Sequence, residues 1–195
     1  MGVLKGLLMP FQLWNDVVLK IGRGLAVVAI ALMVLAILIQ VVFRYVFNSA
    51  LPWPDEAARF FMLWMTGLIA PTGYRRGGFV AIDMLAAALG QRGAAFLGLV
   101  LLFISLGVLA VALPLGWGEV TSFMARASTS SLYYFDIFAG EWEKVPRRWM
   151  LMSLFVGVVL LIIVNIELIL RALITMLDGG EDLRPIPGTG MAGAE

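Results

Sequence analysis

Two chemically versatile residue types are absent from this chain of 195 residues, which contains no cysteine and no histidine. Without cysteine there are no disulfide bonds, thiolate nucleophiles or iron–sulfur ligands. Without histidine the chain lacks the usual haem ligand, the commonest metal ligand and the commonest general base. We therefore expect no catalytic residue, no metal site and no cofactor, and we interpret the sequence as that of a protein that is not an enzyme.

Charged residues are also scarce. They form 14% of the sequence against 62% hydrophobic residues, which is more apolar surface than a soluble domain of this size buries in one core. The 14 lysines and arginines nearly balance the 13 aspartates and glutamates, so no basic surface is available to hold nucleic acid. The composition predicts a membrane protein that contacts the lipid bilayer and binds no nucleic acid.

The N-terminal region lacks the uninterrupted apolar run of a cleavable signal peptide, because Asn15, Asp16, Lys20 and Arg23 divide it. We expect this region to remain on the mature protein. Apolar residues recur there at three- and four-residue steps and predict an amphipathic segment over residues 4–23. This apolar stripe, expected to lie in the membrane interface or to pack on a partner, comprises Leu4, Leu7, Phe11, Trp14, Val18, Ile21 and Leu25.

Four later segments are predicted to cross a bilayer, which takes about 20 residues of helix. They are residues 25–46, 54–74, 94–117 and 149–170. The second has a helix start in Pro54, Asp55 and Glu56, because proline suits the first helical turn and carboxylates suit its positive end. Its charge-free part is short, so we expect it to cross with Arg59 extending to the headgroups.

The remaining segments complete the expected architecture. Residues 79–90 are predicted as a second amphipathic helix, and residues 179–195, rich in glycine, proline and acidic residues without periodicity, as a disordered tail. The hydroxyl run at residues 128–131 lacks the glycine context and the histidine of a serine hydrolase and is expected to be a loop. The predicted fold is an all-α membrane protein, with four transmembrane helices plus short interfacial or amphipathic helices in one domain, residues 1–178.

An even number of spans places both termini on one side of the membrane. The positive-inside rule puts them in the cytoplasm, since eight cationic residues then lie inside and six outside. The inner residues are Lys5, Lys20, Arg23, Arg75, Arg76, Arg92, Arg171 and Arg184, and the outer ones are Arg44, Arg59, Arg126, Lys144, Arg147 and Arg148.

A transporter normally places ionisable groups or unwound backbone near the bilayer midplane, where solute and coupling ions bind. The predicted spans contain few polar residues, and we interpret these as helix-contact residues. They are Gln40, Thr66, Ser105, Ser153, Asn165 and Glu167. No translocation pathway is therefore expected within this chain.

Charged and aromatic residues concentrate where the first predicted span ends and the second begins: Arg44, Trp53, Asp55, Glu56 and Arg59. Arg59 follows Asp55 by four residues and Glu56 by three, so ion pairs can form on one helix face. Two interpretations remain open for this cluster. It is either an interfacial ion pair with an anchoring tryptophan or a docking patch for a partner protein.

A second candidate is Asp83, an acidic residue in the otherwise apolar segment 79–90. It follows Arg75 and Arg76 closely and comes soon after Gly77. One interpretation is a solvated residue on the polar face of a helix. The other is a hinge or a partner contact next to Gly77 and Gly78.

Several short motifs together resemble a known family. They are VFRYVF at residues 42–47, PWPDEAAR at 52–59, Trp64, and RRGGFVAID at 75–83. In this order they are similar to the small permease subunit of tripartite ATP-independent periplasmic (TRAP) transporters, the DctQ-like family. The similarity covers residues 25–90 in sequence detail. Phe79 stands where many members carry histidine, so no role of that histidine is transferred to this chain.

The resemblance implies an inner-membrane subunit that accompanies a large, DctM-like permease subunit. In this family the large subunit moves solute by a sodium-driven, elevator-like motion, and a periplasmic substrate-binding protein delivers the solute, mostly organic acids. A chain without a midplane site suits the role of static scaffold. The alternative is a self-contained, homo-oligomeric four-helix transporter or channel. The family-motif and partner-contact candidates are Arg44, Trp53, Asp55, Glu56, Arg59, Trp64, Gly77 and Asp83.

Overall fold

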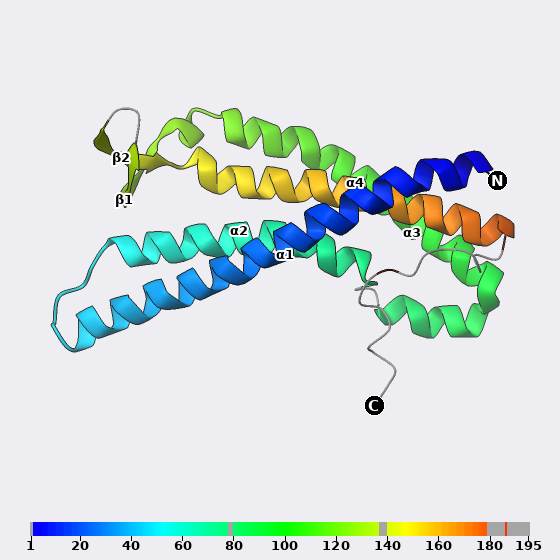
Figure 1. Ribbon diagram of the computed structural model, residues 1–195, viewed down its shortest axis with the longest axis horizontal. Helices are drawn as coiled ribbons and strands as arrows, with labels where there is room; N and C mark the ends of the chain where they lie inside the picture. Colours follow the sequence, from blue (N-terminus) through cyan, green and yellow to red (C-terminus); the bar gives the residue numbers. More distant parts are fainter. Residues whose placement is uncertain (1, 78–79, 137–139, 179–185, 187–195) are drawn as a thin grey trace. The chain divides into compact units, whose positions relative to one another are not determined.

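Helices dominate the computed structural model, which describes residues 2–77, 80–136, 140–178 and Ile186. Side chains are described within these ranges except at residues 2–5, 7, 80–92, 94, 95 and 178. The elements in chain order (Figure 1) are α1 (Gly2–Tyr45), α2 (Trp53–Arg75), α3 (Val80–Thr121), the short 3-10 helix η1 (Met124–Arg126), β1 (Ser128–Asp136), β2 (Glu141–Pro146) and α4 (Arg148–Asp178).

Local sequence signals set the junction between α1 and α2. The backbone N–H of Ser49 donates to the carbonyl of Phe43 at 3.0 Å, while Asn48 adopts a φ of 49°. This bond satisfies a carbonyl in the last turn of α1, and asparagine tolerates the left-handed conformation that follows it. The next helix, α2, begins at Trp53 and carries Pro54 and two carboxylates in its first turn, as the sequence predicts.

Within the residues that the structure describes, three helices are long and apolar enough to cross a membrane: Leu8–Tyr45, Phe96–Thr121 and Arg148–Leu177. The predicted helical membrane fold is confirmed, with one small sheet added to it. The remaining helix, α2, has 23 residues, a sufficient length, but two carboxylates and two arginines make it less apolar. The fourth crossing therefore stays a prediction.

The two amphipathic segments are parts of longer helices. Residues 4–23 form the N-terminal turns of α1, and residues 80–90 form those of α3. Gly22 and Gly24 lie between the amphipathic part and the first span, and single glycines weaken a helix without ending it. The predicted tail, residues 179–195, lies outside the described residues apart from Ile186.

The face that α1 buries differs from its apolar stripe. Buried residues recur at alternating four- and three-residue steps, the spacing of a helix-packing seam. This seam comprises Leu8, Gln12, Asn15, Leu19, Gly22, Ala26 and Ala29. Trp14, Ile21 and Leu25, which belong to the apolar stripe, are more than half exposed. Apart from Leu8 and Leu19 the seam consists of small and polar residues, and many of the large apolar residues of α1 face outwards, as in helices that pack within lipid.

The connection after α3 folds into a β-hairpin. Its strands are antiparallel, with Tyr133 opposite Lys144 and Phe135 opposite Trp142. Aromatic residues favour strands, and Gly140 supplies a positive φ of 68° in the turn. The loop predicted at residues 128–131 is wrong, because these residues begin β1.

The chain divides into two compact units. The first comprises Met1–Ile21, Ala70–Ala112 and Val158–Glu195, and the second comprises Gly22–Ile69 and Leu113–Gly157. In the second unit α2 and α4 approach each other closely. A Cβ atom on Gly67 would overlap the carbonyl oxygen of Ser153, and one on Gly157 would lie 3.0 Å from the Cα of Gly67. Small residues spaced four apart on α4 allow this contact.

Candidate functional site

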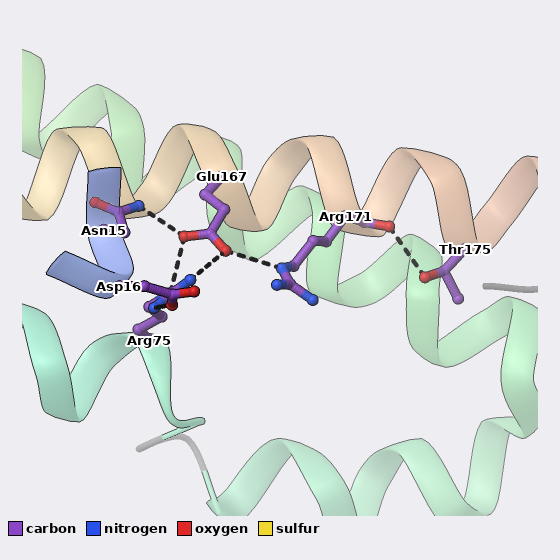
Figure 2. A network of polar contacts seen from close by, with 6 residues as sticks. All are labelled: Asn15, Asp16, Arg75, Glu167, Arg171 and Thr175. Carbon is purple, nitrogen blue, oxygen red and sulfur yellow. Dashed lines mark hydrogen bonds and ion pairs between the residues drawn. The ribbon is translucent and has the colours of Figure 1, made fainter. Parts of the chain in front are cut away.

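A buried charge network lies in the first unit, where side chains from three helices meet (Figure 2). Helix α1 contributes Asn15 and Asp16, α2 contributes its last residue, Arg75, and α4 contributes Glu167 and Arg171. Asn15 belongs to the buried seam of α1. Glu167 and Arg171 share one face of α4 because they are four residues apart.

Glu167 is the centre of the network, and its side chain has no exposed surface. Its Oε2 atom accepts a hydrogen bond from Nδ2 of Asn15 at 2.6 Å. Its Oε1 atom accepts bonds from Nη2 of Arg75 at 2.8 Å and from Nε of Arg171 at 3.0 Å. These bonds replace the water that an ionised carboxylate would otherwise require.

Arg75 joins the two carboxylates of the network. Its Nη1 atom donates to Oδ1 of Asp16 at 2.6 Å, and its Nε atom lies 2.8 Å from Oε2 of Glu167. The side chain is only 5% exposed. A guanidinium group presents its donors in a fixed planar fork, so one residue at the end of α2 can bind α1 and α4 together.

The charges within the network balance. Two carboxylates and two guanidinium groups sum to zero, and each carboxylate lies within 3.0 Å of a guanidinium nitrogen. An unpaired buried charge costs several kcal/mol, so a closed neutral group of this kind is tolerated where its separate members are not. The arrangement therefore ties three helices together. Among the described residues, no group of three or more acidic, histidine or cysteine side chains is placed to hold a metal ion.

Two other polar residues of the predicted spans contact a neighbouring helix or their own helix backbone, as the helix-contact interpretation expects. Asn165 donates from Nδ2 to the hydroxyl of Tyr74 at 2.7 Å, and Ser153 donates to the carbonyl of Met150 at 2.6 Å. The helix-contact interpretation also covered Glu167, but it understates how many residues this side chain binds. Its carboxylate accepts hydrogen bonds from residues of three helices.

In the second unit, Glu56 fastens the hairpin to the start of α2. Its carboxylate accepts hydrogen bonds from the backbone N–H groups of Ser130 at 2.8 Å and Ser131 at 2.7 Å. The hydroxyl of Ser131 donates to the same carboxylate at 2.7 Å and lies 3.0 Å from the carbonyl of Pro52. Glu56 therefore has partners within its own chain that the sequence did not reveal.

The ion pairs predicted on the first turns of α2 do not form. Asp55 and Arg59 are both exposed, and among the described contacts no ion pair joins Arg59 to Asp55 or to Glu56. The carboxylate of Glu56 is directed to β1 instead. Trp53 is 37% exposed, so the outer side of this turn is open to a partner or to lipid.

The other candidate residues lie at separate places. Trp64 donates from Nε1 to the carbonyl of Trp149 at 3.1 Å and so links α2 to α4. The guanidinium carbon of exposed Arg44 lies 5.9 Å from the ring centre of Tyr45. Gly77 has a φ of 82° immediately after α2, where glycine commonly ends a helix. The side chain of Asp83 lies outside the described residues. Contact of these residues with a partner stays a prediction.

Sequence analysis missed the buried charge network, although two signals pointed to it. Glu167 is an ionisable residue within an apolar segment, which is costly unless it has a partner. Arg171 follows it by four residues, the spacing of a helical ion pair. Arg75 and Asp16 could not be assigned in this way, because they lie far apart in the sequence and meet only through the packing of α1, α2 and α4.

Comparison with known proteins gives one match. The family described as "Tripartite ATP-independent periplasmic transporters, DctQ component" matches residues 33–175 of the chain. The matched range includes α2, the hairpin and most of α4, and it includes Arg75, Glu167 and Arg171 of the buried charge network. No curated protein and no solved structure matches the chain.

Proposed function

The chain belongs to the DctQ component family of tripartite ATP-independent periplasmic transporters, and from this premise we propose that it is the static scaffold for the large, DctM-like permease subunit. Family membership makes it a small membrane component of such a transporter. In our proposal the assembled transporter performs sodium-coupled, binding-protein-dependent uptake of a small solute such as an organic acid. This chain neither carries the solute nor catalyses a reaction.

The buried charge network is the observation that best supports a static role. A moving element needs two arrangements of similar free energy. Separating Arg75 from Glu167 would leave desolvated charges without partners, which costs about 3–5 kcal/mol for a buried pair. Because the network engages three helices, the first unit has one strongly favoured arrangement of α1, α2 and α4.

The outward surface of α3 supports the same proposal. Large apolar side chains are exposed along it and require lipid or another membrane subunit as their environment. They include Phe96, Phe103, Ile104, Val108, Val111 and Leu115. Exposed apolar residues along α3 provide a surface for lipid or a neighbouring subunit, and from Phe96 to Leu115 this surface offers no charged group to a solute.

The large subunit is proposed to dock on the outer side of the first turns of α2. Trp53, Asp55 and Arg59 are exposed there, and Arg44 is exposed near the end of α1, before the short connection to α2. Glu56 contributes indirectly, because its carboxylate is engaged by β1. In this proposal α2 is the fourth crossing of the inner membrane, and both termini lie in the cytoplasm.

Reconstitution into liposomes tests the proposed function. The chain alone, the large subunit alone and the two together are compared for sodium-driven, binding-protein-dependent solute uptake. We expect uptake only when the large subunit is present, with the chain increasing its activity or stability. Uptake by the chain alone would contradict the scaffold proposal and favour a homo-oligomeric transporter.

A further inference from the structure

The β-hairpin has two chemically different faces. Residues directly opposite each other on paired strands share a face, as do residues two apart along a strand. Tyr133 faces Lys144 and Phe135 faces Trp142, so these four residues form one face, here called the aromatic face. The ring centres of Phe135 and Trp142 are 5.5 Å apart, and Nζ of Lys144 lies 5.7 Å from the ring centre of Tyr133.

The opposite face is acidic. On it Tyr134 faces Glu143, and Asp136 faces Glu141. The hydroxyl of Tyr134 hydrogen-bonds to Oε2 of Glu143 at 3.1 Å, and its ring lies 5.4 Å from that of Trp149 in the first turn of α4. The two faces therefore separate three aromatic rings and a lysine from three carboxylates.

The aromatic face has no cover within the described part of the chain. Tyr133 is 51% exposed, Phe135 49% and Trp142 69%. Three exposed rings on a two-stranded sheet are a large apolar area to leave in water. A surface outside the described chain must therefore contact them.

The hairpin is attached to the ends of two candidate membrane spans. It follows α3 through η1, and α4 begins at Arg148, two residues after β2 ends (Figure 1). Both helices are apolar enough to cross a bilayer, so the hairpin leaves one span and enters the next at the level of the headgroups. Glu56 additionally holds β1 at the start of α2.

We propose that the aromatic face of the hairpin binds the headgroup region of the bilayer that α3 and α4 cross, with the acidic face turned to water. Tyrosine and tryptophan concentrate at membrane interfaces because their rings are apolar and their edges are polar. Lys144 on this face, with exposed Arg147 and Arg148 beside it, suits anionic phospholipids, which would repel the carboxylates of the other face. The occupant is therefore a lipid surface.

Because the chain contains no cysteine, single-cysteine labelling can test this directly. The full chain, assembled with its large subunit, is placed in vesicles of phosphatidylethanolamine and phosphatidylglycerol. An environment-sensitive fluorophore is attached at Phe135→Cys or Trp142→Cys on the aromatic face and at Glu141→Cys or Glu143→Cys on the acidic face. Lys144→Cys samples the aromatic face without removing a ring, in case loss of the Phe135–Trp142 contact unfolds the hairpin.

Two quenchers then distinguish the environments. Lipids brominated near the headgroup should reduce the emission of the aromatic-face labels. The emission of these labels should also be blue-shifted. Aqueous iodide should instead reduce the emission of the acidic-face labels. Equal quenching of both faces by iodide would place the hairpin in water and overturn the proposal. Protection of the aromatic-face labels from both quenchers would also overturn it, because a protein would then cover that face.

Discussion

At the scale of single residues, Glu167 shows how a charge can be accommodated in a membrane-spanning helix. Its carboxylate is fully buried and accepts hydrogen bonds from Asn15, Arg75 and Arg171. Asp16 supplies the second negative charge, so the network is neutral. The contribution of Glu167 thus depends on its partners and can be tested by removing the charge without changing the shape.

We expect Glu167→Gln to destabilise the chain by about 3–5 kcal/mol, because the buried guanidinium of Arg75 would keep Asp16 as its one carboxylate in the network and Arg171 would lose its ion pair with Glu167. Glu119→Gln is the matched control, since Glu119 is exposed. Thermal unfolding in detergent, followed by circular dichroism, measures the difference. The double variant Arg75→Gln, Glu167→Gln should lose less stability than the sum of the two single variants. Additive losses would show that the two residues do not interact.

Glu56 gives a second prediction at this scale. Glu56→Gln weakens three charge-assisted hydrogen bonds to residues 130 and 131 and should loosen the hairpin by about 1–3 kcal/mol. Amide hydrogen exchange at these residues should then be faster by about tenfold for each 1.4 kcal/mol lost. Asp55→Asn, at the exposed neighbouring position, should leave the exchange unchanged. Equal exchange in both variants would mean that Glu56 does not hold β1.

At the scale of helices, the close approach of α2 and α4 depends on glycine. In Gly67→Ala the new methyl group would overlap the carbonyl of Ser153, so the helices must separate. We expect a loss of about 1–3 kcal/mol, typical of overpacking. Gly73→Ala in the same helix meets no atom within 4 Å and should be neutral or slightly stabilising. The unfolding midpoint of each variant in detergent, compared with that of the unmodified chain, tests this. Equal effects of the two changes would contradict the close packing of α2 against α4.

The elements show what the sequence could and could not predict. The long apolar runs and the Pro54-Asp55-Glu56 start identified the helices, because length and capping are local properties. The packing face of α1 was not predictable from its apolar stripe, since in lipid the large apolar residues face outwards. The small and polar residues of the buried seam, including Asn15 and Gly22, are the better signal there.

The hairpin was missed for a different reason. Its strands are short, and the register of Tyr133 with Lys144 and of Phe135 with Trp142 depends on pairing across a turn. The aromatic residues of this segment are visible in the sequence, whereas the separation of aromatic and acidic faces required the register. The family motif at residues 75–83 identified the family without revealing that Arg75 bridges α1 and α4.

At the scale of the whole molecule, four charged residues hold the helices of the first unit together, and many large apolar residues are exposed to the surroundings. Its family makes it a component of a tripartite transporter, and the buried charge network supports the proposal that the first unit keeps one arrangement during transport. A static role requires that the distance between these helices stay constant in the working transporter.

That distance can be measured by pulsed electron paramagnetic resonance on the complete transporter, made cysteine-free elsewhere. Spin labels are attached at Leu13→Cys on α1 and Met176→Cys on α4, two exposed positions in the first unit. We predict one narrow distance distribution that stays the same without sodium, with sodium, and with sodium and solute delivered by the binding protein. A second distance population that appears with sodium and solute would contradict the static scaffold and make this chain part of the moving machinery.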